Sequence, residues 1–85
     1  MGKQNDPVSP HAYFAARLRE LRAGRRITQG ALAEAMASRG FHWHQTTVSR
    51  IESGQQAAEF DETVALADIF GVGLGSFLPP EEMTA

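Results

Sequence analysis

Two short helical patterns, each closed by a glycine, occupy the middle of the chain. The first runs from Thr28 to Gly40 and the second from Gln45 to Gly54, both with apolar residues at the spacing of one helix face. Glycine ends helices readily, because it adopts the left-handed conformation at little cost. We therefore expect two short consecutive helices, joined at residues 41–44, with the rest of the chain as their scaffold.

The segment before this pair predicts a first helix. Ser9 suits the N-cap, and Pro10 suits the first helical position, where its missing N–H costs nothing. Its apolar face consists of Phe14, Leu18 and Leu21. We expect this helix to end near residues 24–26, and the polar residues 1–8 to form a flexible N-terminal arm.

The segment after the pair predicts two more helices. A fourth helix covers about residues 60–70, and a short fifth helix is closed by the prolines at 79–80. Val64, Ala67 and Phe70 are expected to face the core from the fourth helix, with Leu66 and Ile69 flanking them, whereas Leu74, Phe77 and Leu78 form the short fifth helix. No strand pattern occurs, so the chain is predicted to be a compact all-α domain of five helices over residues 9–78, followed by a flexible acidic tail at 79–85.

Length and composition restrict the class of protein. The 85 residues allow one domain, and the absence of cysteine excludes a disulfide framework and thiolate metal ligands. No apolar run approaches the roughly 18 residues of a membrane span. The N-terminus also lacks the apolar segment of a signal peptide. We expect a soluble cytoplasmic protein that does not contact a membrane.

The charge is distributed unevenly along the chain. Residues 1–55 contain all eight Lys and Arg but only four of the ten Asp and Glu, a net charge of +4. Residues 56–85 contain the other six acidic residues and no Lys or Arg, a net charge of −6. A basic front and an acidic back can present one face to a polyanion, although the whole chain carries a net charge of −2.

The helix predicted from residue 45 has the composition of a helix that reads DNA. Val48 and Ile51 would hold it from behind. Its outer face offers groups that bond base edges: Gln45, Thr46, Thr47 and Arg50. Gln pairs with adenine, Arg with guanine and the Thr methyl with the thymine methyl, in a major groove about 12 Å wide. The alternative, a merely solvated face, would favour Lys and Glu at the most exposed positions.

These residues resemble the helix-turn-helix family of the phage repressor and Cro proteins, also called the xenobiotic-response-element type. The matching segments are Leu18-Arg-Glu-Leu-Arg22, Thr28-Gln29, Leu32-Ala33, Gln45-Thr-Thr-Val-Ser-Arg-Ile-Glu52, Gly54, Leu66-Ala67 and Phe70-Gly71-Val72. The resemblance covers about residues 14–78. It implies a lambda-repressor-like fold of five helices, with the second and third helices as the DNA-reading pair.

The resemblance also implies roles for individual residues. The implied base contacts are Gln45, Thr46 and Arg50. The implied phosphate contacts are Thr28, Gln29, Thr47, Ser53 and Gln55. Gln29 would in addition brace Gln45. Arg22 and Glu52 match a pair that forms a partly buried salt bridge in the family, which makes Glu52 a structural residue and not a catalytic one.

Three departures from the family pattern stand out. The connection between the second and third helices is longer by about five residues, as in actinobacterial members of the family, and His44 takes the capping position. We therefore expect the second helix to continue toward Arg39 and Trp43 to fill the space behind the turn. Residues 55–58 lack the basic groups common after the third helix, and Arg26 stands where the family often has glycine.

The favoured function is a sequence-specific transcriptional regulator, a repressor that binds a two-fold operator in double-stranded DNA as a homodimer. The alternative is an antitoxin or another interaction module of the same fold, which docks a protein partner on the acidic C-terminal face.

Enzymatic and metal-binding functions find little support in the residues. No nucleophile–base pair is suggested, so we expect neither an enzyme nor a cofactor. His42 and His44 form a His-x-His pair, but zinc needs four ligands and His11 lies far away in sequence. We therefore expect no metal site.

Overall fold

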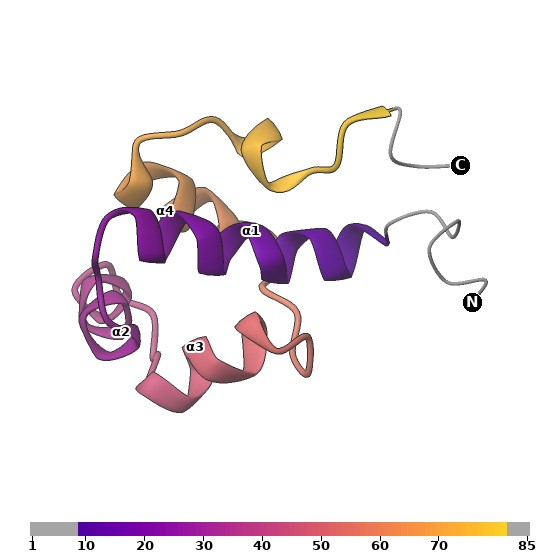
Figure 1. Cartoon of the computed structure of the whole chain (residues 1–85). Coiled ribbons are helices and arrows are strands. Elements are labelled where there is room, and N and C mark those ends of the chain that lie inside the picture. The colour runs from indigo at the N-terminus through magenta and orange to yellow at the C-terminus, as the bar shows by residue number, and fades with distance from the viewer. Residues whose placement is uncertain (1–8, 82–85) are drawn as a thin grey trace.

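The computed structural model describes residues 9–81, and this part of the chain contains no strand. Its elements are α1 (Pro10–Gly24), α2 (Gln29–Ala37), α3 (Gln45–Glu52), α4 (Phe60–Phe70) and the 3₁₀ helix η2 (Leu74–Phe77) (Figure 1). The all-α prediction is therefore confirmed. The predicted arm at 1–8 and residues 82–85 of the predicted tail lie outside the described residues.

The prediction of five helices is wrong, because the described residues contain four α-helices. The expected fifth helix is a single 3₁₀ turn of four residues. Gly73 and Gly75 disfavour a helix in this segment, since glycine loses more backbone freedom there than other residues. Leu78 is already extended, with φ −107° and ψ 138°, as expected of a residue that precedes a proline.

Side-chain caps begin the first two helices. The Ser9 hydroxyl accepts a hydrogen bond of 3.0 Å from the backbone N–H of Ala12, and Pro10 follows it in the first turn. The Thr28 hydroxyl accepts a bond of the same length from the N–H of Ala31. Each cap contributes about 1 kcal/mol, because it satisfies an N–H that has no partner within the helix.

Helix α2 is shorter than the sequence suggested. It ends at Ala37, and residues 38–40 form tight turns in which the N–H of Arg39 donates to the Met36 carbonyl at 3.0 Å. Gly40 then reverses the chain with a φ of +94°, a conformation that only glycine adopts without strain. The expected continuation of α2 to Arg39 is therefore wrong.

Arg26 is the non-glycine residue with positive φ in the described part of the chain, at +57°. It follows the end of α1 and allows the chain to turn toward α2. The family pattern often has glycine at this position, and the backbone of this chain keeps the glycine-like conformation although the side chain is arginine.

The core lies where α1 meets the other helices. Its fully buried side chains are Leu18, Leu32, Met36, Val48, Ile51, Leu66 and Phe77. Trp43 belongs to the same cluster, with 5% of its surface exposed. The indole therefore fills the space behind the long turn, as expected.

The predicted inner face of α4 is confirmed for Ala67 and Phe70 and is wrong for Val64. Ala65, Leu66, Ala67 and Phe70 are buried, whereas Val64 is 42% exposed. Val64 lies one turn after Phe60, so both side chains occupy the stripe that faces away from the core. Leu74 and Leu78 of the C-terminal segment are 39% and 61% exposed.

Figure 1 shows how the elements are arranged around α1. In this view α3 lies below α1, and the C-terminal segment with η2 lies above it. Helix α3 packs against α1 and α2, and η2 packs against α1 and α4. The acidic C-terminal segment therefore leaves the outer side of α3 uncovered.

Candidate nucleic-acid interface

Helix α3 has a strictly divided surface. Val48 and Ile51 are 0% and 1% exposed and attach it to the core. The side chains on the other face are exposed: Gln45, Thr46, Ser49 and Arg50. Since helical residues three and four apart share a face, Thr46, Ser49 and Arg50 form one polar stripe along α3.

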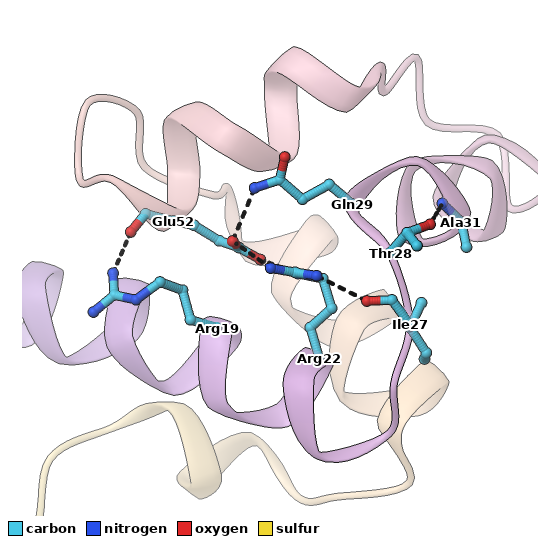
Figure 2. Close-up of polar contacts among 7 residues, drawn as sticks. All are labelled: Arg19, Arg22, Ile27, Thr28, Gln29, Ala31 and Glu52. Atoms are coloured by element: carbon cyan, nitrogen blue, oxygen red, sulfur yellow. Dashed lines mark hydrogen bonds and ion pairs between the residues drawn. The ribbon is translucent and has the colours of Figure 1, made fainter.

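A buried carboxylate fixes the C-terminal end of α3. Glu52 is 4% exposed, and its side chain points from α3 toward α1 (Figure 2). Its Oε2 accepts from Nε of Arg22 at 2.6 Å, and its Oε1 accepts from Nη2 of Arg22 at 3.1 Å. Gln29 adds a third hydrogen bond, from Nε2 to Oε1 at 3.1 Å. One carboxylate therefore joins α3 to both α1 and α2.

Arg22 serves two partners at once. Its Nη1 donates to the Ile27 carbonyl at 2.8 Å, so the guanidinium also fixes the connection between α1 and α2. The hydrogen bond to Glu52 raises the pKa of Arg22, and partial burial opposes this only in part. Arg22 therefore remains charged, and the charges of the pair compensate each other away from water.

Two further side chains of α1 bind carbonyls at the end of α3. The Arg19 guanidinium donates to the Glu52 backbone oxygen, and Nε2 of His11 lies 2.6 Å from the Gly54 oxygen. A carbonyl only accepts, so Nε2 carries the hydrogen in this contact. Donors are favoured here, because the last carbonyls of a helix have no partner within it. Neither contact could be predicted from the sequence, because no short-range spacing indicates them.

The turn before α3 is attached to α4. Nε1 of Trp43 donates to Oε2 of Glu62 at 2.9 Å, and the ring lies in the core. His44 follows as the N-cap residue, and its backbone N–H donates to the Thr47 hydroxyl at 3.1 Å. The sequence predicted the burial of Trp43 but not its partner, which lies 19 residues further along the chain.

The predicted base-contact residues lie together on the outer face of α3. Gln45, Thr46 and Arg50 are exposed, and within residues 9–81 their side chains form no hydrogen bond or ion pair. Arg50 is thus a solvent-exposed cation without a partner in the part of the chain that the structure describes.

The predicted phosphate-contact residues are mostly engaged within the protein. The hydroxyls of Thr28 and Thr47 accept backbone hydrogen bonds, and Gln29 donates to Glu52. The Ser53 hydroxyl donates to the Arg50 carbonyl at 3.1 Å. Gln55 is exposed.

The expected bracing of Gln45 by Gln29 is not seen. No hydrogen bond joins the two side chains in the described part of the chain, because the Gln29 amide nitrogen is directed toward Glu52 (Figure 2).

Residues 9–81 contain neither a metal-binding cluster nor a membrane-spanning helix. No three His, Cys, Asp or Glu side chains are close enough together there to hold a metal ion. Nor is any helix in this range long and apolar enough to cross a bilayer.

The geometry defines a class: a small all-α domain that presents a polar helix on a rigid scaffold. A model of the family described as "Helix-turn-helix domain" matches residues 14–75, most of the chain. The protein belongs to this family, which confirms the resemblance drawn from the sequence. A search of curated proteins found no match.

Solved structures agree with the family assignment. The DNA-binding domain of BldD from S. venezulae is 29% identical, with a TM-score of 0.66, and the match covers 84% of this chain and all of that domain. A hypothetical transcription factor, NHTF from Neisseria, is 20% identical with a TM-score of 0.72, covering 91% of this chain and 86% of that chain.

The same fold also occurs within an enzyme. Hydroxypropylphosphonic acid epoxidase from S. wedmorenis is 22% identical with a TM-score of 0.74, and the match covers 86% of this chain. It covers only 36% of the epoxidase, however. At 22% identity the likeness concerns the fold alone. Most of that enzyme also lies outside the match.

Proposed function

We propose that the protein is a DNA-binding transcriptional regulator in which α2 and α3 form the helix-turn-helix pair and α3 enters the major groove. One observation carries the proposal: Gln45, Thr46 and Arg50 are exposed, and unpaired among residues 9–81, on the outer face of a helix whose inner face is fully buried. The match to the DNA-binding domain of BldD supports it.

The three side chains supply complementary readout chemistry. Arg50 donates to guanine, Gln45 both donates to and accepts from adenine, and the Thr46 methyl meets thymine. None of them must first break an internal hydrogen bond. This matters because each bidentate contact is worth only about 1–3 kcal/mol of discrimination.

The residues proposed to contact phosphate differ in the hydrogen-bond donors that they retain. The hydroxyls of Thr28 and Thr47 accept internally, so each retains its own hydrogen for a phosphate oxygen. Gln29 retains one N–H of its amide, and Gln55 retains both. Ser53 already donates its hydroxyl hydrogen to the Arg50 carbonyl, and it contributes least.

A single α3 reads only a few base pairs, so the proposed active form is a homodimer on a two-fold operator, where it acts as a repressor. Phosphate contacts make such binding depend on salt, because each contact releases bound counterions. The affinity should therefore fall steeply as the ionic strength rises.

The test is a selection of bound sites from random double-stranded DNA, followed by affinity measurements on the selected site. The selection should yield a two-fold sequence. Arg50→Ala should weaken binding to it by about 5–150-fold for each half-site, the equivalent of one bidentate contact per subunit of the dimer.

Arg39→Ala is the matched control for the loss of charge. Arg39 is paired with Asp68 of α4 at 2.7 Å, on the acidic part of the molecule. The affinity of this variant for the selected DNA should stay within about threefold of the wild type, since Arg39 is not proposed to contact a base. Equal effects of the two variants, or a selection that enriches no sequence, would contradict the proposal.

A further inference from the structure

An apolar groove lies between α1, α4 and the C-terminal segment. Its volume is about 260 Å³. We call it the α4 groove, and it is lined by Phe14, Ala58, Phe60, Leu74, Phe77 and Leu78. Phe14 and Phe77 stack with their ring centroids 4.9 Å apart and give the groove a preformed floor.

The walls of the groove carry the large exposed apolar side chains of the described structure. Phe60 is 71% exposed, Leu78 61% and Leu74 39%, and Val64 follows Phe60 on the same stripe of α4. Single exposed apolar residues are ordinary, but several around one depression indicate an interaction site. These side chains do not serve the core, and the proposed DNA contacts on α3 do not use them.

The charge around the groove is negative. Glu59 and Asp61 stand on either side of Phe60, both exposed, and neither forms an ion pair within the described residues. The cation beside the groove, Arg17 of α1, donates to Ser76 and is paired with Glu20 at 2.9 Å, and the chain from residue 56 onward contains no Lys or Arg. An occupant with basic side chains beside an apolar one would therefore complement this surface.

Two other occupants fit less well. With about 260 Å³, the groove is smaller than the roughly 300–1,000 Å³ of typical small-molecule sites. A second copy bound by two-fold symmetry would place the same patch against itself. Glu59 and Asp61 of both copies would then approach each other, and like charges at an interface oppose association.

We propose that the α4 groove docks an amphipathic basic segment of a partner protein. Apolar side chains of this segment enter the groove beside Phe60 and Leu78, and its Lys or Arg side chains face Glu59 and Asp61. This is the helix-in-groove mode of recognition, in which apolar anchors give affinity and flanking charges give specificity.

The interaction does not depend on the proposed DNA binding. In Figure 1 η2, which contributes Leu74 and Phe77 to the groove, lies on the other side of α1 from α3. A partner can therefore bind while α3 remains uncovered, and the test needs no DNA. Its failure would leave the proposed regulator function untouched.

The experiment uses the whole chain and three labelled peptides of about 18 residues. The first has leucine on one helix face and lysine elsewhere, and the second replaces lysine with glutamate. The third replaces leucine with serine and keeps the lysines. Fluorescence polarisation gives the affinities, and amide chemical shifts locate the site. Only the leucine–lysine peptide should bind tightly, with shifts at the residues of the α4 groove.

Variants of exposed residues test the contacts without disturbing the core. Phe60→Ser and Leu78→Ser should each weaken binding of this peptide by about tenfold or more, as expected of anchoring side chains. Asp61→Lys should weaken it several-fold. Glu34→Lys, the same charge reversal at an exposed position of α2, should have no effect.

Several results would overturn the proposal. Equal binding of the serine–lysine peptide would show attraction by charge alone, and equal binding of the leucine–glutamate peptide would remove the role of the acidic residues. Absence of binding by the leucine–lysine peptide, or normal binding by Phe60→Ser, would exclude the groove. A chain that is dimeric on its own and is dissociated by Phe60→Ser would show that a second copy occupies it.

Discussion

Replacing Glu52 with glutamine removes the charge that joins α3 to α1 and α2 while preserving the size of the side chain. Glu52 is 4% exposed and accepts two hydrogen bonds from Arg22 and one from Gln29. Glutamine offers one acceptor oxygen and turns an NH₂ group toward these donors. The variant therefore leaves the Arg22 charge partly buried and uncompensated.

The expected loss of stability is large for a domain of this size. Removing one partner of a buried ion pair costs about 3–5 kcal/mol. The Arg22 side chain retains 20% exposure, so water can reach it and the cost should lie near the lower end, about 3 kcal/mol. For domains of roughly 60–100 residues this corresponds to a decrease in Tm of about 12–24 °C.

Circular dichroism during heating and urea denaturation would measure the effect, with Glu20→Gln as the control. Glu20 also pairs with an arginine, Arg17 at 2.9 Å, but its side chain is 71% exposed. Such a pair contributes no more than about 1 kcal/mol. If Glu52→Gln costs no more than Glu20→Gln, the reasoning that burial makes the Glu52 pair structurally important is refuted.

A double variant separates the charge from the packing. Arg22→Met combined with Glu52→Leu removes both charges and fills similar volume, so it should be more stable than Glu52→Gln alone.

The pair of Arg22 and Glu52 also predicts how stability depends on pH. Because folding raises the pKa of Arg22, the ion pair contributes fully to the stability of the fold below the ordinary pKa of arginine. This contribution is lost only as the pH rises through the raised pKa of the folded state. The part of the difference in free energy of unfolding between wild type and Glu52→Gln that arises from Arg22 should thus be the same at neutral and mildly alkaline pH.

Three further substitutions test the scaffold. Arg26→Gly should stabilise the fold by about 0.5–1 kcal/mol in urea denaturation, because the backbone there has a φ of +57°; a loss of stability would show that the arginine side chain compensates the strain. Trp43→Phe should cost about 2 kcal/mol by the same method, since it removes the hydrogen bond to Glu62, and a cost below about 0.5 kcal/mol would make that bond dispensable. Thr28→Ala should cost about 1 kcal/mol in thermal unfolding and Thr28→Ser much less, because serine retains the cap on Ala31; equal costs would contradict the capping role.

Local signals in the sequence predicted the helices well. The N-caps Ser9 and Thr28 and the reversals at Gly40 and Gly54 depend on neighbouring residues, so they can be found without tertiary information. The inner face of α3 follows in the same way from the spacing of Val48 and Ile51. Such features succeed because a cap or a glycine acts within one turn of the chain.

Tertiary features account for the errors. Val64 fits a helical apolar stripe as well as Leu66 does, and only the packing of α4 against α2 and η2 decides that Leu66 is buried. The fifth helix was predicted from its apolar spacing, but the two glycines around Leu74 reduce it to one 3₁₀ turn. Helical periodicity identifies the apolar residues of a helix but does not predict which of them other elements will bury.

In the candidate site, too, local features could be predicted from the sequence and tertiary contacts could not. The outer residues of α3 could be proposed from the sequence, because base-reading chemistry depends on residue type and on one helix face. The contacts of Arg19 and His11 with carbonyls at the end of α3 could not, since a backbone acceptor has no sequence signature. The engagement of Ser53 with its own helix likewise required coordinates.

The long connection between α2 and α3 determines how the candidate reading helix is supported. The N-terminal end of α3 follows Trp43, which is tied to Glu62 of α4, whereas its C-terminal end is tied to α1 and α2 through Glu52. The two ends thus depend on different helices, and Val48 and Ile51 fill the space between them. A recognition surface gains precision when rigid neighbours fix it at more than one point. The backbone of α3 therefore has a defined orientation, although its outer side chains form no hydrogen bond or ion pair within residues 9–81.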